Sequence, residues 1–236
     1  MTKARDTANL TGSGVGLSLL DIDAGTDIGA ALVDADLMIV DDGAGGTNRK
    51  ATMSRLATYM GTKIGGGLEF ISSTDVSNAA TASFTGFDSS KYDSYLFTCG
   101  NIVPATDGAH FSLRMSVDSG SNYLSASDSY TSVGASGISN GDSALIPLAY
   151  YDIGNIAATE GGSYNIQINT PHINARTYAI AQVTITLPAV SYGNVINVSP
   201  GGGGTKAATV VDGVQFLFNS GNITSGTITM YGLVNS

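Results

Sequence analysis

The chain is poor in cysteine, tryptophan and charge: its 236 residues include one cysteine and no tryptophan, and 12% are charged. A single cysteine cannot form an internal disulfide. Cys99 shares one face of an alternating strand-like run with Tyr95 and Phe97. This pattern predicts a small buried apolar residue, and neither a nucleophile nor a metal ligand.

Long apolar runs are also missing. No stretch is long enough to span a bilayer, and no apolar segment follows the basic residues near Met1. We therefore expect no membrane insertion and no Sec-type signal peptide.

Basic residues are scarce after Gly67, where eleven acidic residues face only Lys91, Arg114, Arg176 and Lys206. The net charge of the whole chain is -9. Nucleic-acid binding needs clustered Lys and Arg to replace the counterions of the phosphates. Nucleic acid is therefore excluded as an expected partner.

Glycine and period-two alternation dominate what remains. The chain holds 31 glycines and 42% hydrophobic residues, which is enough to fill a core but unfavourable for helices. Apolar and polar residues alternate over 110–117, 164–169 and 182–187, as in half-buried antiparallel strands. Further strands are expected over 68–72, 80–85, 94–99, 144–150, 214–219 and 227–234. We predict a mostly β chain in which residues 68–236 form an antiparallel β-sandwich of jelly-roll type.

Residues 1–64 have a different character and form a predicted separate unit, with the break at Gly65–Gly67. Residues 1–20 mix basic residues with glycines and predict an extended arm. Residues 36–53 predict a β-hairpin, and 55–60 a short helix that Ser54 caps and Gly61 ends. So short a helix needs a partner surface in water, so we expect this unit to dock on copies of itself or on another protein.

Motifs for catalysis and cofactors are absent. The glycines at 12, 14 and 16 lack the dinucleotide-binding spacing, and in 201–206 Thr precedes Lys, the wrong order for a phosphate loop. We interpret both glycine runs as flexible turns. The Asp-rich segment 21–32 lacks two calcium ligands, and no pair of carboxylates is spaced for glycoside hydrolysis. We expect no enzyme activity, no cofactor and no metal.

Tyrosines and asparagines in two expected loops, 121–132 and 191–204, are the candidate ligand-binding residues. Tyr rings stack on sugars while Asn side chains supply hydrogen bonds. The tyrosines can equally close the core or a subunit interface. Asp128 disfavours an anionic glycan, so a neutral sugar or a protein is the expected ligand. The candidates are Tyr123, Tyr130, Tyr192, Asn122, Asn194 and Asn197.

Three segments resemble bacteriophage proteins. Residues 214–233 resemble the last hairpin of the jelly-roll head domains at the tips of phage tail fibres. Residues 35–56 resemble the hairpin-helix unit of the virion-proximal parts of phage fibre and receptor-binding proteins, and 3–10 resemble a familiar opening there. The chain departs from long tail fibres because it has no shaft, heptad or fibrous repeat. A short fibre, a capsid head fibre and a capsid decoration protein all remain open.

The resemblance implies a structural protein of the virion that is assembled in the host cytoplasm. It implies a short tail-fibre or receptor-binding subunit that presents its head for host attachment to a cell-surface glycan or protein. A glycan-degrading spike is the less favoured third class. The resemblance also implies a homotrimer, and other virion proteins as partners of the N-terminal unit. The residues expected to anchor the chain in the virion are Lys3, Arg5, Leu37, Ile39, Leu56 and Tyr59.

Overall fold

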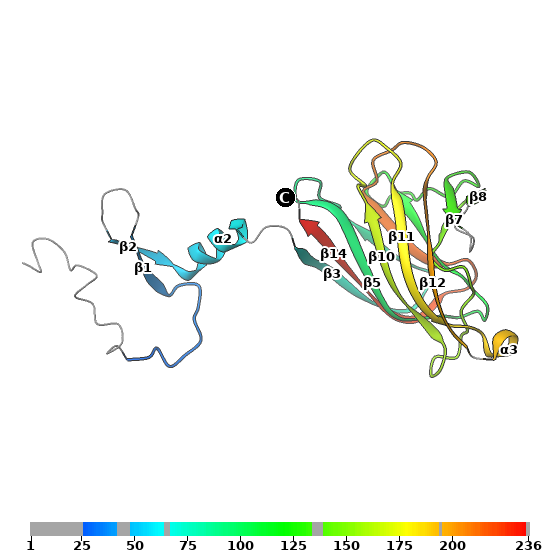
Figure 1. Cartoon of the computed structure of the whole chain (residues 1–236), viewed down its shortest axis with the longest axis horizontal. Helices are drawn as coiled ribbons and strands as arrows, with labels where there is room; N and C mark the ends of the chain where they lie inside the picture. The colour runs from blue at the N-terminus through cyan, green and yellow to red at the C-terminus, as the bar shows by residue number, and fades with distance from the viewer. Residues whose placement is uncertain (1–25, 42–47, 64–66, 134–138, 194, 235–236) are drawn as a thin grey trace, which may run out of the picture. The chain divides into compact units, whose positions relative to one another are not determined.

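The computed structural model describes residues 26–41, 48–63, 67–133, 139–193 and 195–234 (Figure 1). The chain divides into two compact units, Met1–Lys63 and Ile64–Ser236, which are described separately below. The predicted arm over 1–20 lies outside the described residues.

The first unit contains the predicted hairpin and helix. Strand β1 (Leu37–Asp41) pairs antiparallel with β2 (Asn48–Thr52), and helix α2 (Met53–Lys63) follows directly. The helix cap differs from the predicted Ser54, because the Thr52 hydroxyl accepts the N–H of Arg55 at 3.4 Å. The predicted stop at Gly61 is also wrong, since the helix continues through this glycine to Lys63.

The second unit, which we call the head, is built from two antiparallel sheets. The eight-stranded sheet runs, in spatial order, through β3 (Leu68–Ala79), β14 (Ile223–Val234), β5 (Tyr92–Pro104), β10 (Gly161–Asn169), β11 (Tyr178–Thr186), β12 (Ile196–Thr205), β7 (Tyr130–Val133) and β8 (Ser139–Ser143) (Figure 1). The four-stranded sheet contains β4 (Thr81–Thr85), β13 (Gly213–Phe218), β6 (Phe111–Ser116) and β9 (Ile146–Pro147).

The strand order is that of a jelly roll. Eight strands of the head remain when β7, β8, β11 and β12 are left aside. Counted in chain order, the first, eighth, third and sixth of these strands (β3, β14, β5 and β10) lie side by side in the larger sheet. The second, seventh, fourth and fifth (β4, β13, β6 and β9) form the smaller sheet, as in a jelly roll. The four additional strands extend the larger sheet beyond β10. The predicted mostly β sandwich of jelly-roll type is thus confirmed.

The order corrects the hairpin expected near the C-terminus. Strands β13 and β14 follow one another in sequence but belong to different sheets. The turn at Ser220–Asn222, where Gly221 has φ +75°, therefore carries the chain across the sandwich. The second expected turn, Ser225–Gly226, lies inside β14, where the pairing with β5 is irregular.

The core lies between the sheets and follows the predicted alternation. On β10 the buried residues Tyr164, Ile166 and Ile168 alternate with exposed polar ones. Phe97 of the larger sheet lies 5.2 Å, between ring centroids, from Phe216 of the smaller sheet. Each such fully buried side chain contributes about 1.5–3 kcal/mol to folding, so the head has a core of its own.

Strand β12 replaces the flexible turn expected at Gly201–Gly204. The glycines are needed because neighbouring backbone lies too close for side chains. A Cβ on Gly202 would lie 2.3 Å from the carbonyl oxygen of Ala179, and one on Gly201 would lie 2.1 Å from that of Leu148. Strands β7 and β8 were also absent from the sequence-based expectation.

Candidate functional site

Three tyrosines gather at the surface of the head near α3 (Ala189–Tyr192). The ring of Tyr151 lies 4.8 Å from that of Tyr150 and 6.2 Å from that of Tyr192, both edge to face. Tyr150 is 49% exposed and Tyr192 is 45% exposed. The sequence analysis selected Tyr192 but missed Tyr150 and Tyr151, whose adjacent pair of aromatic residues was the available signal.

A buried carboxylate positions Tyr192. Glu160 is 4% exposed, and its two oxygens accept the N–H groups of Ala189 and Ile156, each at 2.8 Å. Ala189 is the first residue of α3, and Gly193 ends this helix in the left-handed conformation. Glu160 therefore ties the segment before β10 to the short helix that carries Tyr192.

A hollow of about 210 Å³ opens beside Tyr150. Strand β6, strand β9, strand β7 and the segment after β13 contribute its walls, which combine apolar and uncharged polar side chains. The Nδ1 atom of His110 is buried and has no hydrogen-bond partner. The lining residues are His110, Ser112, Ser132, Leu145, Pro147, Ala149, Tyr150 and Asn219.

The expected loop 121–132 does not form a binding surface with Tyr130. Tyr130 begins β7 and is fully buried; its hydroxyl accepts the N–H of Met115 at 2.7 Å and donates to the carbonyl of Leu124 at 3.0 Å. Its predicted loop position is therefore wrong, because these two backbone groups draw the phenol into the core. Burial raises the pKa of Tyr130 to about 12.

Asn122 and Tyr123 do lie in a loop, but the loop is largely satisfied by its own contacts. Asp118 accepts the side-chain amide of Asn122 at 2.7 Å and its backbone N–H at 2.8 Å. These bonds hold the pKa of Asp118 below its usual value. Tyr123 is half-buried, while Asn122 is exposed.

The other two candidate asparagines do not join the tyrosines in a described site. Asn197 lies in β12, with its Oδ1 atom buried and without a hydrogen-bond partner. Asn194 lies outside the described residues.

The outer face of the larger sheet forms a second candidate surface. Strands β10, β11 and β12 are adjacent and contain no charged residue. Their outward side chains include Val198 and Ile196, which are 75% and 69% exposed, and Ile180 and Tyr178, which are 55% and 51% exposed. We call this surface the uncharged face.

Two hollows lie on the uncharged face. One of about 600 Å³ is lined by polar side chains, among them Asn165, Gln182 and Thr184. The other, of about 440 Å³, lies over the glycines of β12 beside Tyr178 and Ile180, with Arg176 at its border. The face therefore combines exposed apolar residues with depressions where glycine replaces a side chain.

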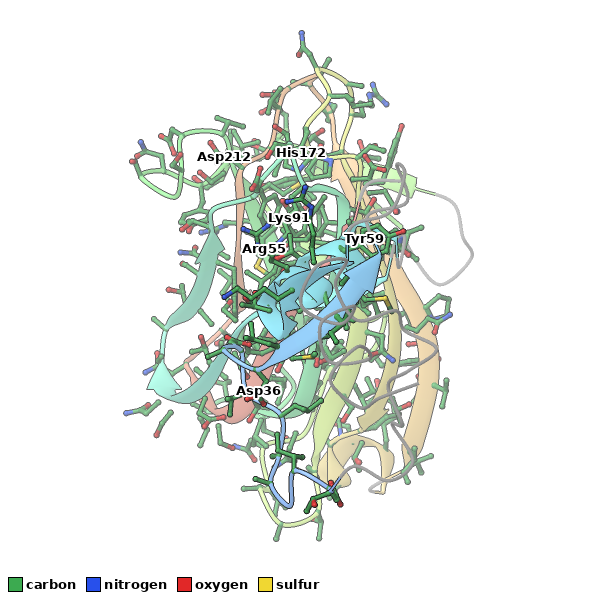
Figure 2. The ribbon with its side chains drawn as sticks, turned by 90° about the vertical axis from the view of Figure 1, so that its left-hand side faces the viewer. Asp36, Arg55, Tyr59, Lys91, His172 and Asp212 are labelled. Atoms are coloured by element: carbon green, nitrogen blue, oxygen red, sulfur yellow. The ribbon has the colours of Figure 1, made fainter. Side chains whose placement is uncertain are left out.

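Glu69 and the cysteine of the head have structural contacts. Glu69 pairs with Lys91, labelled in Figure 2, at 2.6 Å. Cys99 is buried as predicted, and burial raises the pKa of its thiol. Within the described ranges, no group of three or more His, Cys, Asp or Glu could hold a metal ion.

In the first unit, four of the predicted anchoring residues are exposed. Leu37 and Ile39 alternate along β1 and are each 58% exposed. Leu56 and Tyr59 lie on α2, where Leu56 is 37% exposed and Tyr59, labelled in Figure 2, is 58% exposed. Lys3 and Arg5 lie outside the described residues. None of the helices in the described parts of the chain has the length and apolar character needed to cross a membrane.

A scan against protein-family models and searches of curated proteins and solved structures find no match to this chain.

Proposed function

We propose that this chain is a structural protein of a phage virion, a short tail-fibre or receptor-binding subunit that is anchored by residues 1–64 and presents the head for host attachment. The observation that supports this proposal is the contrast between the two units. The head encloses its own core, whereas β1 and α2 of the first unit expose the apolar side chains of Leu37, Ile39 and Tyr59. Such side chains gain stability when a partner covers them.

The proposed subunit assembles as a homotrimer through the uncharged face. Each copy carries a net charge of -9, so copies repel one another except where their contact surfaces lack carboxylates. The three strands span roughly 14 Å by 30 Å, an area of about 420 Å². This area is smaller than the roughly 800 Å² that each partner buries in a stable interface. Contacts outside these three strands therefore have to contribute to the trimer.

Deletion of residues 1–64 tests the anchoring role. We expect the remaining chain to be soluble and folded but missing from purified particles, because the residues that bind other virion proteins have been removed. Incorporation is measured by immunoblotting of gradient-purified virions, with the full-length chain as the control. Truncated protein present in particles at the full-length level would refute the proposal.

A capsid head fibre or decoration protein is the second candidate, because the sequence contains no shaft between the two units. Both candidates use the same anchoring and head units and differ in where the first unit docks. Quantitative mass spectrometry of purified particles distinguishes them, since a tail protein is present at far lower copy number than a capsid decoration.

A further inference from the structure

The hollow beside Tyr150 and the neighbouring tyrosines have the composition of a carbohydrate site. We propose that this surface binds a neutral sugar chain, with one ring in the hollow and the next rings on Tyr151 and Tyr192. The inference rests on the proposed attachment function, because it names the class of receptor that the head recognises. It places recognition away from the loop of Asn122 and Tyr123.

The polar groups of the hollow suit hydroxyl groups. The Asn219 side-chain oxygen accepts the backbone N–H of His110 at 2.9 Å, which fixes the orientation of this amide at the wall of the hollow. The same Asn219 amide carries an NH₂ group with two donors, while a sugar hydroxyl both donates and accepts. A bound sugar hydroxyl can therefore accept a hydrogen bond from the Asn219 amide at the wall of the hollow.

The aromatic rings suit the apolar faces of sugar rings. Tyr150 borders the hollow, and the ring of Tyr151 lies between the rings of Tyr150 and Tyr192. Tyr150 and Tyr192 are each nearly half exposed, so their rings are accessible for stacking. Exposed tyrosines that combine an apolar ring with a polar hydroxyl are typical of surfaces that bind amphipathic ligands.

The size and charge of the hollow select the ligand class. Its volume of about 210 Å³ is below the roughly 300–1,000 Å³ of sites that enclose drug-sized molecules, so it admits one ring of a longer ligand. Among the described residues, no Asp, Glu, Lys or Arg lines it. Since the chain as a whole is acidic, an anionic sugar would be repelled, and a neutral one is favoured.

Saturation-transfer NMR on the full-length protein tests the proposal. The probes are D-glucose, D-galactose, L-rhamnose and N-acetyl-D-glucosamine, with D-glucuronate as the charged comparison, at up to about 20 mM to reveal millimolar Kd values. We expect transfer to at least one neutral sugar and a weaker signal for glucuronate. Absence of transfer to all four neutral sugars would overturn the proposal.

Substitutions locate the site. Tyr150→Ala is expected to raise the Kd of the bound monosaccharide about tenfold, whereas Tyr150→Phe keeps the stacking ring and most of the affinity. Tyr192→Ala is expected to raise the Kd of an oligosaccharide of the same sugar and to leave that of the monosaccharide unchanged, because Tyr192 lies outside the hollow. Tyr123→Ala, in the loop favoured by the sequence, is the matched control and leaves the Kd unchanged. Thermal unfolding verifies that each variant is folded. A Kd that depends on Tyr123 and not on Tyr150 or Tyr192 would refute the assignment.

The result is independent of the anchoring experiment, because sugar binding is measured on purified protein and incorporation on particles. Particles that carry Tyr150→Ala are expected to assemble normally and to adsorb poorly to host cells. Lost adsorption without sugar binding by the wild-type chain would reject a sugar and indicate a protein receptor.

Discussion

At the scale of single residues, whether a tyrosine is buried or exposed depends on neighbours that are distant in sequence. Tyr130 and Tyr192 each follow a serine in a segment expected to be a loop, yet one is fully buried and the other is 45% exposed. The phenol of Tyr130 reaches two backbone groups, those of Met115 and Leu124. Tyr192 is positioned indirectly, because the buried Glu160 accepts the N–H of Ala189 at the start of α3, the helix that carries Tyr192.

A second residue-scale feature is the aromatic cluster around His172. Its Nε2 atom lies 3.1 Å from the hydroxyl of Tyr95, and Phe87 stacks on the Tyr95 ring at 3.9 Å. Burial lowers the pKa of His172, while Asp88 and Asp93 act in the opposite direction. The folded head therefore favours the neutral imidazole.

This shift predicts that acid destabilises the head through His172. The unfolded chain binds the proton more tightly, so the stabilisation by neutral His172 is complete above about pH 6.5 and is lost as the pH falls through the lower folded pKa. We expect a smaller decrease in Tm between about pH 7.5 and pH 5.5 for His172→Gln than for the wild-type chain. Scanning calorimetry over this range is the measurement. Equal decreases in the two proteins would contradict the prediction.

At the scale of elements, β12 illustrates how glycine can build a strand. Glycine is unfavourable in strands as a rule because it loses more backbone entropy than other residues. Here Gly202 has φ +146°, and its neighbours in β11 leave no room for a side chain. Close approach of the strands, and not propensity, explains the four consecutive glycines. It also creates the apolar hollow on the uncharged face.

Gly202→Ala is expected to destabilise the head by about 2–4 kcal/mol, because the added Cβ strains both the backbone and the contact with Ala179. Gly100→Ala in β5 is the matched control, since a Cβ there meets nothing within 4 Å; its expected effect is within about 0.5 kcal/mol. Urea unfolding, monitored by tyrosine fluorescence, measures the free energy of unfolding of both variants. A loss no larger for Gly202→Ala than for Gly100→Ala would show that β12 tolerates side chains.

At the scale of the whole molecule, acidity and an uncharged apolar face have to be considered together. Dispersed negative charge keeps copies apart in most orientations, so the uncharged face is the orientation in which association costs least. Exposed Val198 and the hollow over Gly202 lie on the same face, so one copy offers both a protrusion and a depression. In a ring of three copies, the protrusion of one copy can enter the depression of the next.

Val198→Lys tests this surface. The new charge is expected to lower the association constant of the full-length chain at least tenfold, because a Lys buried between copies is desolvated without a partner. Lysine also makes the net charge less negative, so general repulsion cannot explain dissociation. Ile173→Lys, at a residue 52% exposed outside β10–β12, is the control and should leave association unchanged. Sedimentation equilibrium measures the mass, and an unaltered oligomer in Val198→Lys would exclude this face.

The sequence by itself determined the fold class and most core strands. Alternation is a local property, since successive side chains of a strand point to opposite faces. The pattern at 164–169 therefore identified which side of β10 is buried before its neighbours were known, and Tyr95, Phe97 and Cys99 were assigned to the core for the same reason. The hairpin of β1 and β2 followed from turn residues between two short strands.

Only the tertiary structure decided which strands share a sheet and which tyrosines meet. The second half of β12, Gly201–Gly204, carries no alternating pattern, because glycine is required there by the close approach of atoms in neighbouring segments. The separation of β13 from β14 depends on pairing with β4 and β5, far away in sequence. Tyr150, Tyr151 and Tyr192 come together because Glu160 binds the start of α3. These contacts are nonlocal, and a local sequence pattern contains no record of them.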